Sequence, residues 1–141
     1  MITPYITLDG TKYALQQGSY LRNWVRSFTS YLSANVVRLN FIDKGPGVRT
    51  YTFQVILANW PAGGLLANNG LTMTPEQGMA ALEATYAKIA TPVSFTDPFG
   101  HTSTFGVYMT DLQQSIPAYG TTQQTFILAT VQLSEATQTV N

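Results

Sequence analysis

The chain has 141 residues, of which 45% are hydrophobic and only 10% are charged, and its seven Lys and Arg residues balance its seven Asp and Glu residues. This length fits one domain with a core of its own, and the absence of cysteine excludes disulfides and thiol chemistry. The neutral total argues against a nucleic-acid groove, the start lacks the pattern of a signal peptide, and no apolar run approaches the ~20 residues of a membrane span.

The scarcity of charge is informative in itself. Globular domains usually carry about a quarter of their residues as Lys, Arg, Asp and Glu. This chain is rich in Thr, Gln, Ser, Asn and Gly instead, and a surface of that kind resists association weakly. Burial in an assembly is one reason to tolerate such a surface, and a surface that faces glycans is another.

The charges are also unevenly distributed along the chain. Residues 1–50 hold six basic and two acidic residues, hence a net charge of +4, and residues 51–141 hold one basic and five acidic residues, hence −4. Two interpretations remain open. Opposite halves of neighbouring copies could meet head to tail, as in rings and stacks, or the two halves could interleave within one fold.

The first elements in the chain are predicted strands. Residues 5–8 and 11–15 flank Asp9-Gly10, a pair that suits the positive φ angles of a two-residue hairpin turn. Residues 20–32 are rich in aromatic and β-branched side chains and predict a strand, with a bend near Ser27. Residues 36–42 and 50–58 alternate in polarity around the turn at 43–47, which predicts a second antiparallel hairpin.

A long loop without periodicity follows over residues 59–73. Its large apolar side chains are Trp60, Leu65, Leu66 and Leu71. Loops of this length in compact domains are usually functional or disordered, and disordered segments are seldom this apolar. These side chains therefore need a partner, which is either the loop's own core or another subunit.

A helix is predicted over residues 74–90. Thr74 is a good N-cap, Pro75 suits the first helical position and Gln77 completes a capping box. The apolar residues that recur at helical spacing are Met79, Leu82, Tyr86 and Ile89. We expect Pro92 to end the helix, because the residue before a proline avoids helical backbone angles.

The remainder predicts strands again: residues 93–96, the turn Asp97–Gly100, residues 105–109, a loop with Pro117 and Gly120, and a last strand over 125–135. Apolar residues on both faces near the start of the last strand indicate a central position or a covered face. With seven or eight strands and one helix, residues 1–141 predict a single α+β, mainly β domain: an antiparallel β-sandwich or barrel flanked by one α-helix.

The sequence offers no convincing catalytic set. Ser103, His101 and Asp97 can be written as a triad, but they lie on a turn without a nucleophile elbow. Asp97 and Asp111 can be written as a carboxylate pair, but each suits a turn or a strand end. The single histidine has no other ligands at metal-binding spacing. We therefore expect no enzymatic activity, no cofactor and no metal.

The aromatic residues suggest a second function class. A sugar-stacking platform could be formed from among Trp24, Trp60, Tyr13, Tyr20, Tyr51, Tyr108 and Tyr119. Aromatic residues in strands more often belong to the core or to cross-strand pairs. The alternative to an assembly subunit is therefore a carbohydrate-binding β-sandwich module.

In their order along the chain and in the character of their residues, these elements resemble the tail-tube and distal-tail proteins of bacteriophages. The likeness is carried by the hairpin at 6–10, the central hairpin around 43–48, the long loop that leads into the helix at 74–90, the sequence TPVSFTDPFG at 91–100, and the last strand over 126–135. The resemblance implies a small β-sandwich or barrel with one helix, and a structural virion protein without catalytic residues.

The same resemblance implies how such a protein works. It would be made in the host cytoplasm and would form a ring, commonly a hexamer, with other tail proteins as neighbours. Strands of adjacent subunits would form the inner wall, and DNA would pass through the lumen without sequence-specific binding. Inner walls of tail tubes are often acidic, and this chain has no acidic strand face. A tail-tip, baseplate or adaptor ring therefore suits it at least as well as the tube.

The expected interface residues follow from side-chain chemistry. We expect Trp60, Leu65, Leu66 and Leu71 to act as anchors, because large apolar side chains dominate interface energies. Arg22, Arg26 and Arg49 would pair with acidic residues of a neighbour. The alternative for these arginines is that they keep a strand face soluble.

Overall fold

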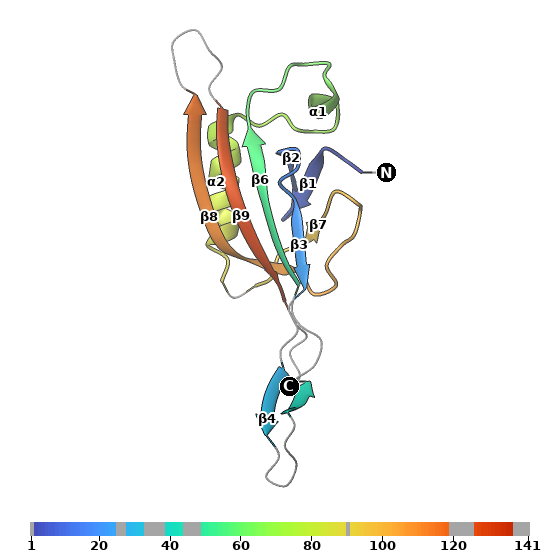
Figure 1. The fold of residues 1–141 in the computed structure, drawn as a ribbon. Helices are drawn as coiled ribbons and strands as arrows, with labels where there is room; N and C mark the ends of the chain where they lie inside the picture. Colours follow the sequence, from blue (N-terminus) through green and yellow to red (C-terminus); the bar gives the residue numbers. More distant parts are fainter. Residues whose placement is uncertain are drawn as a thin grey trace.

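A computed structural model describes residues 2–24, 28–32, 39–43, 49–89, 91–118 and 126–136. Within these ranges the chain forms nine strands and two helices (Figure 1). The strands are β1 (Tyr5–Leu8), β2 (Thr11–Leu15), β3 (Leu21–Trp24), β4 (Phe28–Leu32), β5 (Leu39–Asp43), β6 (Arg49–Leu57), β7 (Phe95–Thr96), β8 (Val107–Ala118) and β9 (Phe126–Glu135). The helices are α1 (Leu65–Asn68) and α2 (Pro75–Tyr86).

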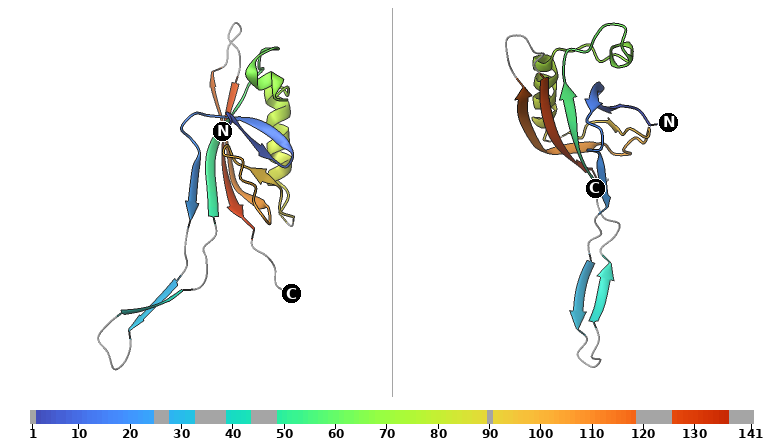
Figure 2. Two further views of the ribbon diagram at one scale, coloured as in Figure 1. Left: turned by 90° about the vertical axis from the view of Figure 1, so that its right-hand side faces the viewer. Right: turned by 45° about the horizontal axis from the view of Figure 1, so that its top comes forward.

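Seven of the strands form one antiparallel sheet in the order β7-β1-β2-β6-β9-β8, with β3 paired to the first half of β6. The mainly β, antiparallel fold with a helix on its side is thereby confirmed. The sheet is open and curved, and a bridge between Val93 and Val107 brings its two ends together at one point. Figure 2 shows α2 against one face of the sheet, while the opposite face of β3, β6 and β9 has no helix on it.

The opening hairpin is confirmed in detail. Asp9 and Gly10 have φ angles of 52° and 80°, and Leu8 pairs with Thr11 on either side of this turn. The turn lies beside α2, where Asp9 forms an ion pair with Lys88 and accepts a hydrogen bond from Thr85. The hairpin is therefore fixed to the helix as well as to the sheet.

The predicted pairing of residues 36–42 with 50–58 is wrong. β5 pairs with β4, so that Leu39 lies opposite Leu32, and β6 pairs with β3, so that Arg49 lies opposite Trp24. Alternation identifies a strand but not its partner, and β6 takes β9 as its neighbour along most of its length. Residues 44–47 of the predicted turn at 43–47 and the bend near Ser27 lie outside the described residues, whereas Asp43 is the last residue of β5.

β4 and β5 form a separate two-stranded ribbon. In Figure 1 this ribbon lies beyond the lower ends of β3 and β6, away from the sheet and α2. β3 and β4 run in succession on one side and β5 and β6 on the other. The strand pairs β3–β6 and β4–β5 are therefore nested in the sequence; we call these four strands the long hairpin, and its base, β3 with β6, belongs to the sheet.

The cap of α2 is confirmed. Thr74 Oγ1 accepts a hydrogen bond from the Gln77 amide at 3.2 Å, and Gln77 Oε1 accepts one from the Thr74 amide at 3.0 Å. The helix ends at Tyr86 instead of continuing to residue 90. Tyr86 and Ile89 are exposed, and Thr85 takes their predicted place on the buried face. Its side chain and Lys88 both contact Asp9 in the first hairpin.

The core lies between α2 and the sheet. The predicted inward residues of the last strand are buried, and β9 has the central position that its composition indicated, between β6 and β8. The buried side chains of β6 and β9 are Tyr51, Phe53, Val55, Leu57, Ile127, Ala129, Val131 and Leu133. A Cβ at Gly78 would lie 2.8 Å from Leu57 Cδ2, so α2 packs very closely on β6.

β8 is longer than predicted. The strand expected over residues 105–109 runs to Ala118, while Phe105 precedes it and is exposed. Pro117, which was expected in a loop, belongs to this strand and lies within an irregularity in pairing between Ser115 and Ala118. The strand tolerates this proline because it lies at the edge of the sheet.

Candidate functional site

The loop between β6 and α2 has a defined structure, because backbone hydrogen bonds close it on itself. The Gly64 amide donates to Pro61 O at 3.1 Å, and the Leu71 amide donates to Leu66 O at 3.1 Å. Lys12 Nζ donates to Asn69 O at 3.0 Å and ties the loop to β2. The short helix α1 lies within this loop, at the upper right of Figure 1.

This loop brings three predicted interface residues together. Trp60, Leu65 and Leu66 line one pocket of about 300 Å³, whose other walls are Pro4, Pro61, Gly64 and Ala67. Every lining residue is apolar, and Leu65 is 67% exposed. The pocket is therefore an apolar hollow on the surface, which we call the loop pocket.

Leu71 does not belong to the free surface. Only 5% of it is exposed, and it lies beside a small pocket that Tyr13, Leu57 and Met73 also line. Its expected role as an anchor for another subunit is replaced by a place in the chain's own interior. Of the two partners that the sequence left open for the loop, its own core and another subunit, Leu71 takes the first.

The two predicted interface arginines that the structure describes each form an ion pair within the chain. Arg22 lies 3.4 Å from Asp97 Oδ2, and Arg49 Nε lies 3.3 Å from Glu135 Oε2. Both basic side chains thus have an acidic partner within the chain. Arg26 lies outside the described residues.

These pairs also decide how the two charged halves of the sequence are arranged. In the described part of the chain, each of the three ion pairs joins a residue before position 51 to one after it: Arg22 to Asp97, Arg49 to Glu135, and Lys88 to Asp9. The halves interleave in these contacts. The head-to-tail interpretation of the charge distribution therefore has no support from them.

The face of the sheet opposite α2 is mainly polar, and it also holds the acidic Asp111 and the apolar Leu21, Ile56 and Leu128. Directly paired residues share a face, and the alternate residues of β6 and β9 that point to α2 are buried. The polar residues in register on the helix-free face are Asn23, Thr50, Thr52, Gln54, Thr130, Gln132, Ser134, Asp111, Gln113 and Ser115. Gln54 Nε2 donates to Thr130 Oγ1 at 3.3 Å, which links two of these strands. We call this surface the polar sheet face.

Two strand edges border the polar sheet face. On one side is β8, a strand of 12 residues that pairs with β9. On the other side is β3, a strand of four residues that pairs with β6. Edge strands present unpaired backbone N–H and C=O groups that can add a strand from another chain. Between its two irregularities β8 keeps regular register from Asp111 to Ser115.

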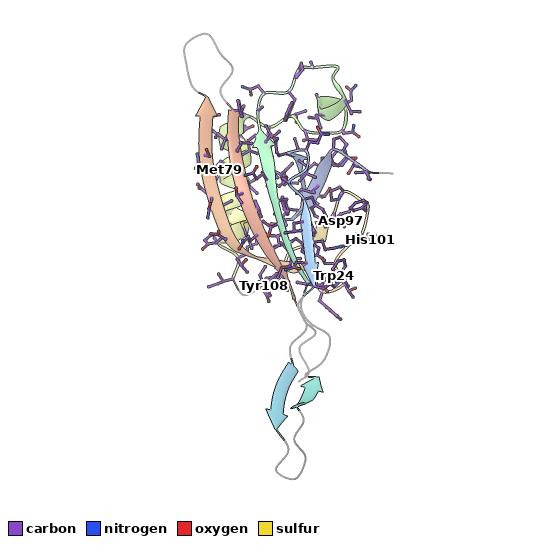
Figure 3. The ribbon with its side chains drawn as sticks, viewed as in Figure 1. Trp24, Met79, Asp97, His101 and Tyr108 are labelled. Carbon is purple, nitrogen blue, oxygen red and sulfur yellow. The ribbon has the colours of Figure 1, made fainter. Side chains whose placement is uncertain are left out.

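The residues considered for catalysis have structural surroundings. Asp97 is buried, and its Oδ1 accepts backbone hydrogen bonds from Phe99 at 3.0 Å and His101 at 2.8 Å. His101 is exposed on the turn (Figure 3), and Asp111 accepts a hydrogen bond from Gln113 at 3.1 Å. Among the described residues, Ser103 Oγ is buried without a hydrogen-bond partner. This arrangement does not form a triad or a carboxylate pair.

The described residues also include no group of three or more His, Asp or Glu side chains placed to hold a metal ion. No helix among them has both the length and the apolar character that crossing a bilayer requires.

Three of the seven aromatic residues considered for sugar stacking pack inside the chain. Tyr13 and Tyr51 are buried, and the Tyr20 ring lies 6.3 Å from that of Phe53. Trp24 differs, because it is 60% exposed and the Arg22 guanidinium lies 4.7 Å from the centre of its ring. Tyr119 lies outside the described residues.

Two features of the surface were not anticipated. Glu135 accepts hydrogen bonds at the end of β9, and its partners Tyr51 and Arg49 come from β6. The polar sheet face was also missed, although the alternation of Thr and Gln with apolar residues over 50–57 and 126–135 contains its signal. No protein-family profile matches the chain, and no curated protein matches it in sequence.

Proposed function

We propose that this chain is a structural, non-enzymatic subunit of a bacteriophage tail that associates with copies of itself in a ring. The observation that carries the proposal is the open sheet. The strands β3, β6, β9 and β8 combine a helix-free face with two free edges, β3 on one side and β8 on the other. The resemblance to tail-tube and distal-tail proteins supplies the biological setting, with other tail proteins as further partners.

The edges suggest how the ring closes. β8 of one copy would add to β3 of the next, and repetition of this head-to-tail contact around an axis gives a closed ring. The polar sheet faces would then line the lumen. Their Thr, Gln and Ser side chains would hydrate the wall, and DNA would pass without sequence-specific contacts. The low charge of the chain is consistent with a subunit whose sheet edges are buried between copies.

The loop pocket offers a second contact. Trp60, Leu65 and Leu66 form a concave apolar surface on a different part of the molecule from the β8 edge. Buried aromatic and aliphatic anchors in pockets supply much of the binding energy in interfaces. We assign this pocket to contacts along the tail, with a copy in the adjacent ring or with another tail protein.

The test is the mass and shape of the purified chain. We expect light scattering over a concentration series to report closed oligomers, and negative-stain images to show rings. Gln113→Pro and Gln114→Pro form a matched pair, because neighbouring strand residues direct their N–H groups to opposite sides. One of the two N–H groups points to β9 and the other to the open edge of β8. The substitution that removes the N–H at the open edge breaks no hydrogen bond within the sheet, so that variant should keep its melting temperature and lose the ring. A wild-type chain that stays monomeric at millimolar concentration would contradict the proposal.

A carbohydrate-binding module is the second candidate, and the exposure of Trp24 favours it. A sugar that stacks on this ring would change tryptophan fluorescence in a monomeric protein. Trp24→Ala should abolish that change, and Trp60→Phe should preserve it, because Trp60 lies in the loop pocket. Saturable binding of this kind by a monomer would support the glycan function over the ring.

A further inference from the structure

The backbone hydrogen bonds of β6 show which of its residues point toward β3. The Gln54 amide donates to Ser19 Oγ at 3.1 Å, and Gln54 O accepts a hydrogen bond from the Gln16 amide at 2.8 Å. Both partners belong to the segment between β2 and β3, on the side of β6 opposite β9. Alternate residues of a strand direct their N–H and C=O groups to the same side. Thr50 and Thr52 therefore point toward β3.

The outward residues of β3 follow from this direction. Thr50 is paired with Asn23 and Thr52 with Leu21, so the backbone groups of Asn23 and Leu21 point back to β6. The N–H and C=O groups of Arg22 and Trp24 then point away from β6. Among the strands that the structure describes, β6 is the partner of β3 and no other strand pairs with it. The free edge of β3 thus presents the hydrogen-bonding groups of two residues.

The same alternation identifies the outward residues of β8. Gln54 points away from β9, so its partner Thr130 points away from β6 and toward β8. The β8 partner of Thr130 is Gln113, whose backbone groups therefore point to β9. The neighbours of Gln113 in the strand point the other way. Leu112 and Gln114 thus present their N–H and C=O groups at the open edge of β8.

The two edges match in direction and in face. Each neighbouring pair in β3, β6, β9 and β8 is antiparallel, so β3 and β8 run in opposite directions, as their arrows show in Figure 1. Rotation about an axis that runs along the strands preserves strand direction. In the proposed ring, β8 of one copy therefore meets β3 of the next in antiparallel orientation. The outward residues of both strands also lie on the α2 face of the sheet.

We propose that β3 pairs with residues 112–115 of β8 in the neighbouring copy, with Trp24 opposite Leu112 and Leu21 opposite Ser115, an inference that rests on the proposed ring. A slip of one residue would turn every side chain to the wrong face, so the alternatives are slips of two. The regular part of β8 begins one residue before this range and ends with it. A slip of two in either direction would move part of β3 onto an irregularity of β8.

This register joins backbone and side-chain contacts. Trp24 with Leu112 and Arg22 with Gln114 become hydrogen-bonded pairs, in which the two residues exchange both of their backbone hydrogen bonds. Trp24 is 60% exposed in the single chain, and Leu112 is a partly buried residue packed against the core. Contact between them covers the exposed ring and extends the apolar core of one copy to the edge of the next. Aromatic anchors of this kind supply much of the energy of an interface.

Engineered disulfides test the register, because the chain has no cysteine of its own. Asn23→Cys with Gln113→Cys places one thiol on each edge, at exposed positions that face each other in a non-hydrogen-bonded pair, where side chains are closest. Within one copy β6 and β9 separate the two positions by about 14 Å, which is too far for a disulfide. Asn23→Cys with Asp111→Cys, and Asn23→Cys with Ser115→Cys, are the matched controls for slips of two. Gln113→Cys alone tests pairing of β8 with β8.

Non-reducing electrophoresis after oxidation with diamide measures the products. We expect Asn23→Cys with Gln113→Cys to give a series of covalent multimers that ends at the number of copies in the ring. Its yield should exceed that of either slipped pair about tenfold, because diagonal neighbours lie farther apart than a disulfide spans. Adding Gln114→Pro, which removes an N–H at the open edge, should abolish the multimers. The melting temperature under reducing conditions shows that each variant folds.

The outcomes separate this register from the ring itself. Higher yield from a slipped pair, or rings that give no disulfide at any of the pairs, would overturn the register and leave the ring in place. Dimers from Gln113→Cys alone would show that β8 pairs with β8, which would also overturn it. A wild-type chain that stays monomeric would refute the proposed ring and the register together.

Discussion

Arg22 and Asp97 lie 75 positions apart in the sequence, and their side chains meet at 3.4 Å beneath the end of β3. The arginine also stacks on Trp24, so that one guanidinium joins an exposed ring to a buried carboxylate. This contact gives a basic residue that was expected at an interface an acidic partner within its own chain. It also makes the turn at Asp97 a structural support for the base of the long hairpin.

Asp97→Asn should therefore destabilise the fold. The substitution removes the charge that attracts Arg22 and replaces one acceptor oxygen by an NH₂ group, which faces donors. We expect the free energy of unfolding to fall by about 3 kcal/mol, as for other buried charged partners. Urea denaturation followed by fluorescence measures this change. Asp111→Asn, which alters a half-exposed carboxylate, should leave the midpoint nearly unchanged; equal effects would show that Asp97 has no special role.

Gly106→Ala should be more harmful than a similar change elsewhere. Gly106 has a φ angle of 83°, and an added Cβ would lie 2.8 Å from Val93 O. We expect a loss of about 3 kcal/mol, from the positive φ and the clash with backbone. Gly70→Ala is the control, because its φ angle is 93° but nothing lies within 4 Å of the added atom. Thermal unfolding of both variants separates the clash from the backbone strain.

Truncation of Leu71 should lower stability, whereas truncation of Leu65 should leave stability nearly unchanged and affect association. Leu71→Ala removes a buried side chain and should cost about 2–4 kcal/mol of unfolding free energy. Leu65→Ala removes an exposed one and should change stability by less than about 0.5 kcal/mol. If the loop pocket binds a partner, Leu65→Ala should weaken association without lowering the melting temperature. Calorimetry and light scattering on the same samples measure the two effects.

The chain should lose stability above pH 10 for a defined reason. Burial raises the pKa of Tyr13 to about 12, and burial also raises the pKa of Tyr20 and of Tyr51. An unfolded tyrosine ionises near pH 10, so between these values the unfolded state has lost protons that the folded state keeps. The contribution of each tyrosine is thus complete below pH 10 and falls as the pH rises through the folded pKa.

A spectrophotometric titration measures this effect at the wavelength of tyrosinate absorbance. The buried tyrosines should ionise only as the fold opens, after the exposed ones. Tyr13→Phe should reduce the slope of stability against pH above 10. It should not lower stability at neutral pH, because within the described part of the chain the Tyr13 hydroxyl has no hydrogen-bond partner. A marked loss at neutral pH would show that this hydroxyl has a partner in solution.

Local chemistry determined what could be predicted from the sequence. The Asp9-Gly10 turn and the Thr74–Gln77 cap depend on residues next to each other in the chain, and both were predicted correctly. The buried face of β9 followed from alternation alone. The partner of β5 could not be found in this way, because alternation is the same whichever strand lies alongside.

The candidate site was predictable only in part. Trp60, Leu65 and Leu66 were recognised as apolar side chains without a periodic element, and they meet in one pocket. Leu71 belongs to the same apolar run, and nothing local distinguishes it from the others. The pairs Arg22–Asp97 and Arg49–Glu135 depend on contacts between distant segments, which no spacing within one segment reveals.

The pairing of Leu8 with Phe95 has a consequence for synthesis of the chain. The ribosome releases β1 and β2 long before β7 exists, so one side of the first hairpin waits for a partner while the intervening residues emerge. Chains with many such distant pairings fold slowly, because loop closure must precede the contacts that reward it. During the time between the emergence of Leu8 and that of Phe95, this side of the first hairpin is thus open to misassociation, and a chaperone that binds it would protect the nascent chain.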